Sequence, residues 1–222
     1  MFPLRDTQPS YSRPVVTVLL IVVNILVFLF EFSLDPYTRN AFIAQYGLVP
    51  DRFGLTNIVT SMFLHGGWLH VLSNMWFLWV FGDNIEDILG HGKYLLFYLA
   101  CGAAAAVTQV IFSLGSHVPM VGASGAIAGV MGAYMVKFPR SRVLSLVFIV
   151  FFITTVEIPA WLMLIYWFLM QLFSGVGSIG YTQASQGGTA FFAHVGGFLA
   201  GIALVNLMGT RERYWRRRDL SW

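Results

Sequence analysis

The chain has 222 residues, of which 57% are hydrophobic and only 10% are charged. Soluble domains carry about 25% charged residues, so this composition excludes an ordinary soluble domain and indicates a membrane protein. The single cysteine, Cys101, excludes an internal disulfide.

Two long segments, residues 94–136 and 158–210, contain no Asp, Glu, Lys or Arg. Each is long enough for two membrane spans of about 20 residues. Each is also interrupted in its middle by turn-forming residues, and the second interruption is the Gly/Ser-rich stretch 174–189. The charge-free segments therefore predict two pairs of helices.

The apolar segments together predict an all-α, polytopic membrane protein with six transmembrane helices. Residues 143–157 are apolar but end in the acid Glu157, with Pro159 just beyond, and they form either half of a longer fifth span or a partly embedded connection. We prefer the connection, because Pro159 favours the start of a new helix. The predicted helices are Pro14–Leu34, Trp68–Ile85, Tyr94–Leu114, Ala123–Phe138, Pro159–Phe173 and Ala190–Met208.

The six-helix membrane domain takes residues 14–208, between an N-terminal segment, 1–13, and a basic tail, 209–222. Six spans place both termini on one side of the membrane. Of the 13 Lys and Arg residues, only Arg39 and Arg52 fall on the opposite side, so the positive-inside rule predicts cytoplasmic termini. We expect the basic tail to contact anionic lipid of the bilayer rather than nucleic acid.

Polar residues inside a membrane are costly, so their grouping is informative. His70 and Asn74, in the second helix, are four residues apart and share one helical face. Ser124 opens the fourth helix, and His194 lies one turn inside the sixth. Because helices two, four and six run in the same direction, these residues lie at one depth, near the outer face.

Glycines at helical spacing predict a close contact between the fourth and sixth helices, because small residues let two backbones approach. If the two glycine stripes meet, Ser124 and His194 come within reach of each other. The stripes are Gly125, Gly129 and Gly132 in the fourth helix and Gly197 and Gly201 in the sixth.

Each of these features has a simpler explanation when taken alone. A lone serine among glycines is more often helix packing than a nucleophile, and a lone intramembrane histidine is more often a hydrogen-bond donor between helices. A metal site at His65, His70 and His194 lacks a carboxylate or cysteine ligand, so we expect no metal. A transporter would show internal repeats, and none is evident. Glu86 and Asp87 most simply cap and anchor the end of the second helix.

Three motifs in chain order nevertheless resemble those of the rhomboid intramembrane serine proteases. They are HGGWLHVLSN, then GASG, then AHVGGFLAG, and the resemblance runs from about the first helix to the sixth. It implies the basic six-helix form and the hydrolysis of peptide bonds in or next to transmembrane helices by a Ser–His dyad. It implies no metal or organic cofactor, and single-span membrane proteins as substrates. The alternative is a catalytically inactive relative that binds transmembrane helices. The short loops and the absence of a targeting presequence favour a prokaryotic cytoplasmic membrane.

The resemblance also implies a role for each matching residue. Ser124 corresponds to the nucleophile and His194 to the general base. His70 and Asn74, with the backbone N–H of Ser124, correspond to groups that stabilise the oxyanion. The residues that correspond to structural or helix-packing positions of the family are His65, Glu86, Gly122, Gly125, Gly129, Gly197 and Gly201.

The chain departs from the family pattern at two places. Many relatives have an aromatic residue four positions after the serine, packed on the base, whereas this chain has Ala128. We therefore expect support for His194 from Phe191, Phe198 or an aromatic residue of the second helix. The Trp-Arg pair of the first loop is also missing. The stretch 174–189 and the short fifth helix are expected to form a mobile cap and a lateral entry for a substrate helix.

Overall fold

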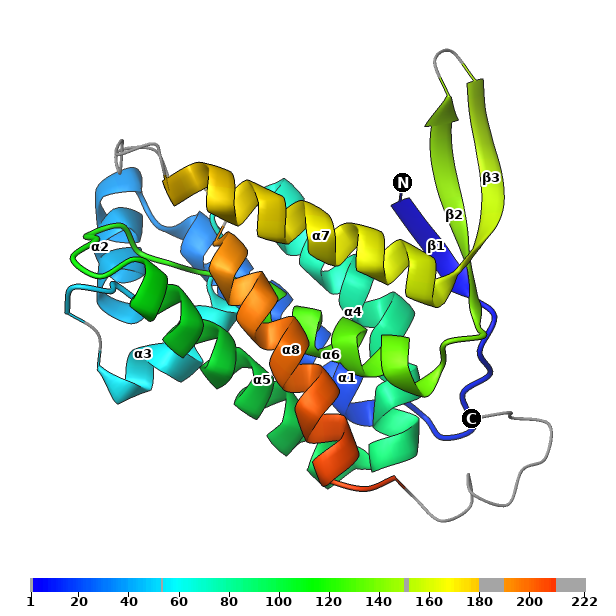
Figure 1. Cartoon of the computed structure of the whole chain (residues 1–222). Coiled ribbons are helices and arrows are strands. Elements are labelled where there is room, and N and C mark those ends of the chain that lie inside the picture. Colours follow the sequence, from blue (N-terminus) through cyan, green and yellow to red (C-terminus); the bar gives the residue numbers. More distant parts are fainter. Residues whose placement is uncertain (1, 53, 150–151, 180–189, 211–222) are drawn as a thin grey trace.

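The computed structural model describes residues 2–52, 54–149, 152–179 and 190–210, and most of these residues are helical (Figure 1). Three strands are β1 Phe2–Asp6, β2 Arg142–Ile149 and β3 Phe152–Pro159. The helices are α1 Val15–Ser33, α2 Pro36–Tyr46, α3 Leu55–Thr60, α4 Trp68–Leu89, α5 His91–Phe112, α6 Ser124–Lys137, α7 Ala160–Ile179 and α8 Phe191–Leu207, with a 3₁₀ turn at Ser61–Phe63.

Each of the six predicted helical segments is a helix in the structure, as α1, α4, α5, α6, α7 and α8. The helix α6 lies at the centre, because α4, α5, α7 and α8 all pack against it. Its residues from Gly125 to Tyr134 are all buried. Large apolar side chains instead cover the outside of the bundle, as at Leu26 on α1 and Leu169 on α7. A central small-residue helix inside an apolar outer ring suits a membrane protein.

Within the described residues, two helices, α1 and α5, are long and apolar enough to cross a membrane, judged by length and composition. The apolar stretches of α7 and α8, at Ala160–Val176 and Phe191–Leu207, are shorter. The six-span topology therefore stays a prediction.

The prediction of an all-α fold is wrong in one respect, since Arg142–Ile149 and Phe152–Pro159 form two paired strands, the hairpin of the sheet. β2 pairs antiparallel with β3 from Arg142↔Pro159 to Ile149↔Phe152, and β1 joins the other edge of β2 in antiparallel pairing. The β-branched and aromatic residues of this segment favour strands. The two strands project beyond the helices at one end (Figure 1), while at the other end they pack on α7 and bury Val143 and Ser145. These residues are therefore neither half of a helix nor an irregular connection.

The first loop is also more ordered than the sequence indicates, because it contains α2, α3 and the 3₁₀ turn. Asp35 caps α2 by accepting hydrogen bonds from the backbone N–H groups of Tyr37 and Thr38, at 3.0 and 3.2 Å. The loop is tied to the segment before α6 by an isolated bridge between Leu48 and Met120. This tie helps to hold the chain that leads into Ser124.

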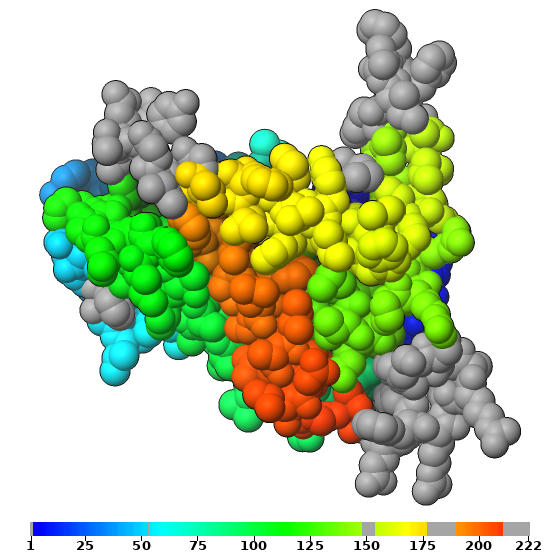
Figure 2. All heavy atoms as spheres, in the orientation of Figure 1, coloured from blue at the N-terminus to red at the C-terminus, as the bar shows by residue number. Residues whose placement is uncertain are grey.

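Two expectations concern segments that the structure describes only in part. Residues 174–179 belong to the last turns of α7, and residues 180–189 lie outside the described ranges, so the predicted cap is not tested. Most of the basic tail, residues 211–222, lies outside them as well. The described parts of α7 and α8 form much of one face of the molecule (Figure 2).

Candidate active site

The glycine stripes of α6 and α8 meet in the structure, as the sequence analysis predicts. A Cβ atom added at Gly197 would overlap the carbonyl oxygen of Gly125, and one added at Gly201 would overlap that of Gly129. Even alanine would therefore force the two backbones apart. We call this contact the glycine seam; its members are Gly125, Gly129, Gly132, Gly197 and Gly201.

Next to the glycine seam, the side chains of Ser124 and His194 are hydrogen-bonded. Ser124 is the first residue of α6, and its Oγ lies 2.7 Å from Nε2 of His194. The His194 side chain lies in the first turns of α8 and is buried. The two residues are 70 positions apart in the chain, and the helix contact brings them together.

A glutamine that the sequence analysis missed holds the start of α8. Oε1 of Gln109, on α5, accepts a hydrogen bond of 3.0 Å from the backbone N–H of Ala193. The first N–H groups of a helix lack partners within the helix, and the residue before α8, Ala190, makes no side-chain cap. Gln109, on α5, therefore supplies the cap that the residue before α8 does not provide.

The other side of the imidazole contacts α7. Nδ1 of His194 lies 2.7 Å from Oε1 of Gln171, and the Trp167 ring lies 5.6 Å from the imidazole between centroids. Trp167 and Gln171 are four residues apart and so share one face of the helix. The support for His194 thus comes from α7, a source that the sequence analysis did not name. Gln171 is a polar residue within an apolar helix, and this feature of the sequence could have indicated that it has a polar partner.

His70 and Asn74 lie against the turn before Ser124. Gly122 has φ +126°, a conformation that favours glycine, and its N–H donates to the carbonyl oxygen of Ser61 at 2.9 Å. A Cβ atom at Gly122 would lie 2.7 Å from Nε2 of His70 and 3.6 Å from Nδ2 of Asn74. The structure therefore gathers both predicted oxyanion residues beside the start of α6.

Asn74 is held in turn by a buried histidine. Its Nδ2 lies 3.0 Å from Nε2 of His65, whose side chain is buried. The backbone N–H of His65 donates to Oε2 of Glu31 on α1, at 3.0 Å. An amide carries two N–H donors, so one remains for another acceptor. His65 thus links Asn74 to Glu31 of α1, a residue that the sequence pattern did not single out.

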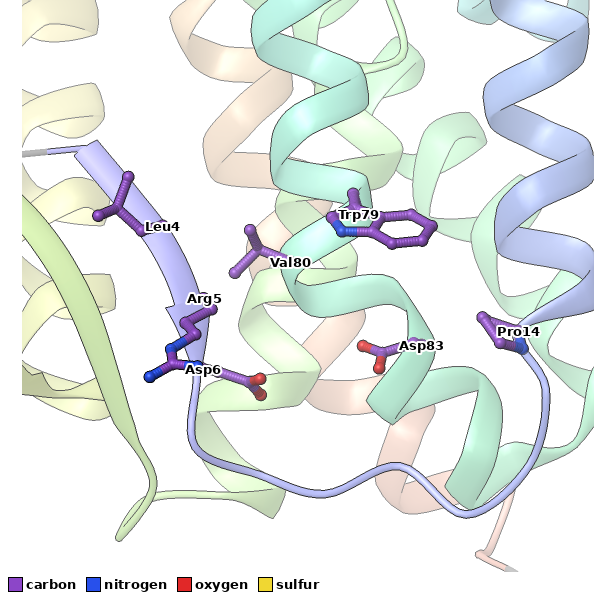
Figure 3. A pocket seen from close by; sticks show the side chains of 7 residues that line it. All are labelled: Leu4, Arg5, Asp6, Pro14, Trp79, Val80 and Asp83. Atoms are coloured by element: carbon purple, nitrogen blue, oxygen red, sulfur yellow. The ribbon is translucent and has the colours of Figure 1, made fainter.

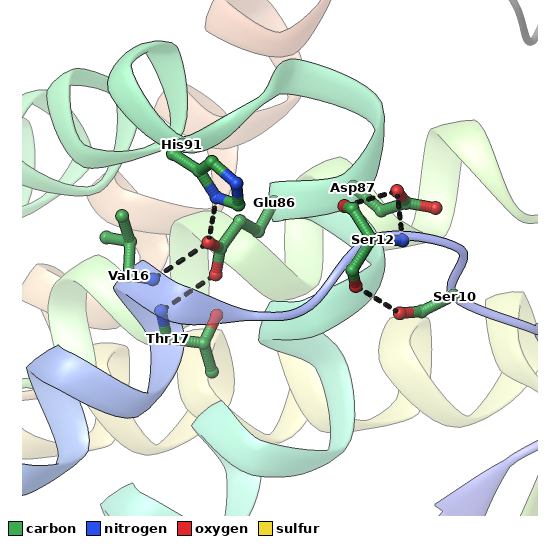
Figure 4. Close-up of polar contacts among 7 residues, drawn as sticks. All are labelled: Ser10, Ser12, Val16, Thr17, Glu86, Asp87 and His91. Atoms are coloured by element: carbon green, nitrogen blue, oxygen red, sulfur yellow. Dashed lines mark hydrogen bonds and ion pairs between the residues drawn. The ribbon is translucent and has the colours of Figure 1, made fainter.

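At the other end of α4, two carboxylates bind backbone N–H groups of the N-terminal segment and α1 (Figure 4). Glu86 accepts from Val16 and Thr17 at 2.8 Å each, and it also bonds Nδ1 of His91 at 2.6 Å. These two acids are expected from the sequence to anchor their own helix, α4. In the structure Glu86 instead caps α1, and Asp87 binds the segment that precedes α1. We call this group the Glu86 cluster; its members are Ser12, Val16, Thr17, Glu86, Asp87 and His91.

A pocket of about 190 Å³ opens between β1 and α4 and contains none of the predicted site residues (Figure 3). Asp6 and Asp83 both line it. Burial raises the pKa of Asp6 to about 7. A hydrogen bond from the Tyr134 hydroxyl works in the opposite direction, and the nearby Asp83 adds to the increase.

The comparisons with known proteins now bear on this arrangement. A family model described as the Rhomboid domain matches residues 52–211, which include Ser124, His194, His70 and Asn74. The chain belongs to the rhomboid family. The resemblance noted from the three motifs is thereby confirmed.

Several relatives of this rhomboid-family protein are named as rhomboids. It is 34% identical over 128 residues to rhomboid protease GluP of Bacillus subtilis (strain 168), covering 56% of this chain and 25% of that protein. It is 28% identical over 167 residues to the bovine presenilin-associated rhomboid-like protein, mitochondrial, covering 73% and 40%. It is 27% identical over 186 residues to RHOMBOID-like protein 6, mitochondrial, of Arabidopsis thaliana, covering 78% and 54%.

The matches span between a quarter and about half of the length of these relatives. Membership of the rhomboid family supports a membrane protein and a hydrolase of the protease class. The relatives include a bacterial protein and mitochondrial ones, so they do not support the expected prokaryotic cytoplasmic membrane.

Proposed function

We propose that this rhomboid-family protein is a serine endopeptidase that hydrolyses peptide bonds in or next to transmembrane helices of membrane-protein substrates. The observation that carries the proposal is the 2.7 Å contact between Ser124 Oγ and His194 Nε2 at the end of the glycine seam. A serine hydroxyl becomes a useful nucleophile when a neighbouring base accepts its proton, and a neutral imidazole is suited to that role.

The chemistry is acyl transfer in two halves. Ser124 Oγ bonds to the scissile carbonyl carbon while His194 Nε2 takes the hydroxyl proton. The tetrahedral intermediate then breaks its C–N bond, and the leaving amine takes the proton from His194. In the second half, water attacks the acyl-enzyme and gives its proton to His194. Release of the carboxylic acid returns that proton to Ser124, and neither half needs a metal or an organic cofactor.

The oxyanion of the intermediate has three candidate donors. The backbone N–H of Ser124 lies in the first turn of α6, where N–H groups lack helical partners and the helix dipole favours negative charge. The second N–H of Asn74 and the ring of His70 lie beside the same turn. Removing one donor of this kind typically lowers the rate about 10²–10³-fold.

The proposed topology places residues 14–208 in the membrane as six spans, with residues 1–13 and 209–222 in the cytoplasm. The distribution of the Lys and Arg residues supports this orientation. The site then lies toward the outer face. We take the substrates to be single-span proteins whose helices unwind easily, because a scissile peptide must leave its helical hydrogen bonds.

The second candidate is an inactive relative that binds transmembrane helices. The observation that favours it is Ala128, which stands where many relatives have an aromatic residue packed on the base. Trp167 of α7 packs on His194 instead, and this contact favours the active protease.

Cleavage of a single-span substrate in liposomes tests the proposal, with wild type compared with Ser124→Ala, His194→Ala and the exposed control Ser33→Ala. We expect wild type and Ser33→Ala to cleave and both site variants to lose cleavage while they remain folded. Equal product from Ser124→Ala would remove the nucleophile assignment. If wild type neither cleaves nor is labelled at Ser124 by a fluorophosphonate, the inactive, helix-binding alternative is correct.

A further inference from the structure

Both ring nitrogens of His194 are engaged, each by a residue of a different helix. Nε2 contacts Ser124 of α6, and Nδ1 contacts Oε1 of Gln171 of α7, both at 2.7 Å. The imidazole is buried between these partners. Water therefore competes little with either hydrogen bond.

The identity of the atoms sets the direction of the two bonds. An amide oxygen only accepts hydrogen bonds, so Nδ1 of His194 must carry the ring proton. In a neutral imidazole the other nitrogen, Nε2, then has the free lone pair. That lone pair points at Ser124 Oγ, which is the arrangement a general base needs.

We propose that Gln171 is the positioning residue of His194: its side-chain oxygen holds the proton on Nδ1 and so keeps Nε2 free to accept the proton of Ser124. This inference rests on the proposed function. It assigns to a neutral amide the orienting task that a carboxylate performs in Ser-His-Asp sites. The helices α6 and α8 of the described chain contain no Asp or Glu, so the orienting group comes from α7.

The position of Gln171 makes the base depend on a third helix. Trp167, one turn earlier on α7, packs on the same imidazole and also on Phe198 of α8, with centroids 5.6 and 6.2 Å apart. These contacts fix the rotation of α7 about its own axis. Gln171 is therefore presented to Nδ1 by packing between α7 and α8.

Two substitutions separate the acceptor from the bulk of the side chain. Gln171→Met keeps the length but removes the acceptor, and we expect kcat to fall about tenfold with KM unchanged, because the imidazole loses the hydrogen bond that orients it. Gln171→Glu keeps an acceptor and adds charge. We expect it to restore kcat and to move the acidic limb of the pH–rate profile to higher pH, since a carboxylate stabilises the imidazolium.

Gln109 supplies the matched control. It also anchors α8, through Ala193, without touching the imidazole. Gln109→Met is expected to lower Tm and to leave the acidic limb of the pH–rate profile in place. Nitrogen-15 NMR of His194 gives a readout besides activity: wild type shows the proton on Nδ1, and Gln171→Met shows a mixture of tautomers.

The outcomes distinguish this inference from the proposed function. If Ser124→Ala cleaves like wild type, or if wild type neither cleaves nor reacts with a fluorophosphonate, the proposed function fails and the inference fails with it. If wild type cleaves and Gln171→Met keeps the wild-type kcat, pH profile and tautomer, only the inference is overturned. If both Gln171 variants lose activity in proportion to lost folding, the role of Gln171 is structural only.

Discussion

The glycine seam and the Glu86 cluster both join distant segments in a nearly charge-free bundle, by opposite means. The seam contains no side chains at its contact points, and a Cβ atom at either α8 glycine would overlap a carbonyl group of α6. The Glu86 cluster buries two carboxylates that accept backbone N–H groups near the start of α1. The seam depends on close approach of two backbones, and the cluster depends on satisfied hydrogen bonds.

The two regions tolerate different substitutions. A backbone contact has no flexible part that moves aside, so any added atom separates the helices. A carboxylate that accepts several N–H groups tolerates small shifts but not its own removal, because each donor is then buried without a partner. The seam should therefore control the geometry of Ser124 and His194, and the cluster should control stability.

The largest effect is expected from Gly201→Ala. The new methyl group overlaps the backbone of Gly129, and overpacking of this kind costs about 3 kcal/mol or more when backbone must move. We expect a large drop in Tm in detergent and loss of substrate cleavage. Gly92→Ala is the control, because nothing lies within 4 Å of the added Cβ atom. A Tm of Gly201→Ala equal to that of wild type would show that the seam yields easily.

A smaller loss, in stability alone, is expected from Glu86→Ala. The substitution leaves the N–H groups of Val16 and Thr17 without their acceptor, and removal of a buried charged partner costs about 3 kcal/mol. Thermal unfolding should show it, while kcat per folded molecule stays at the wild-type value. The control is Glu157→Ala, whose side chain is 52% exposed and should change stability by less than about 0.5 kcal/mol. A fall in kcat per folded molecule would contradict the division of roles.

The third effect depends on pH and is expected at Asp6, in the strand β1. Its pKa is raised from 3.8 to about 7, so the folded protein holds the proton more tightly than the unfolded chain does. The resulting stabilisation is complete below about pH 3.8 and is lost as the pH rises toward 7. Asp6→Asn stays neutral and should exceed wild type in Tm at pH 7.5, with the difference shrinking toward pH 5. A difference that is constant with pH would contradict this account.

Hydropathy and residue spacing along the chain predict the helices and the pairing of Ser124 with His194. A polar residue in an apolar run is costly and therefore conspicuous, which is why Ser124 and His194 were found. Glycine spacing is likewise a property of one helix, and two such stripes suggest each other as partners. The sheet was not predicted because the segments 142–149 and 152–159 are apolar enough for a membrane span, and β1, which adds the third strand, is far away in the chain.

The helical segments, the glycine stripes and the grouping of Ser124 with His194 follow from the sequence alone. The tertiary structure alone decided which groups complete them: Gln171 for His194, Gln109 for the start of α8, and α1 as the partner of Glu86. The physical reason is that hydropathy and spacing are local, whereas the rotation of one helix against another is not. A single Gln in an apolar helix reveals that it needs a partner, and only packing shows which partner it has.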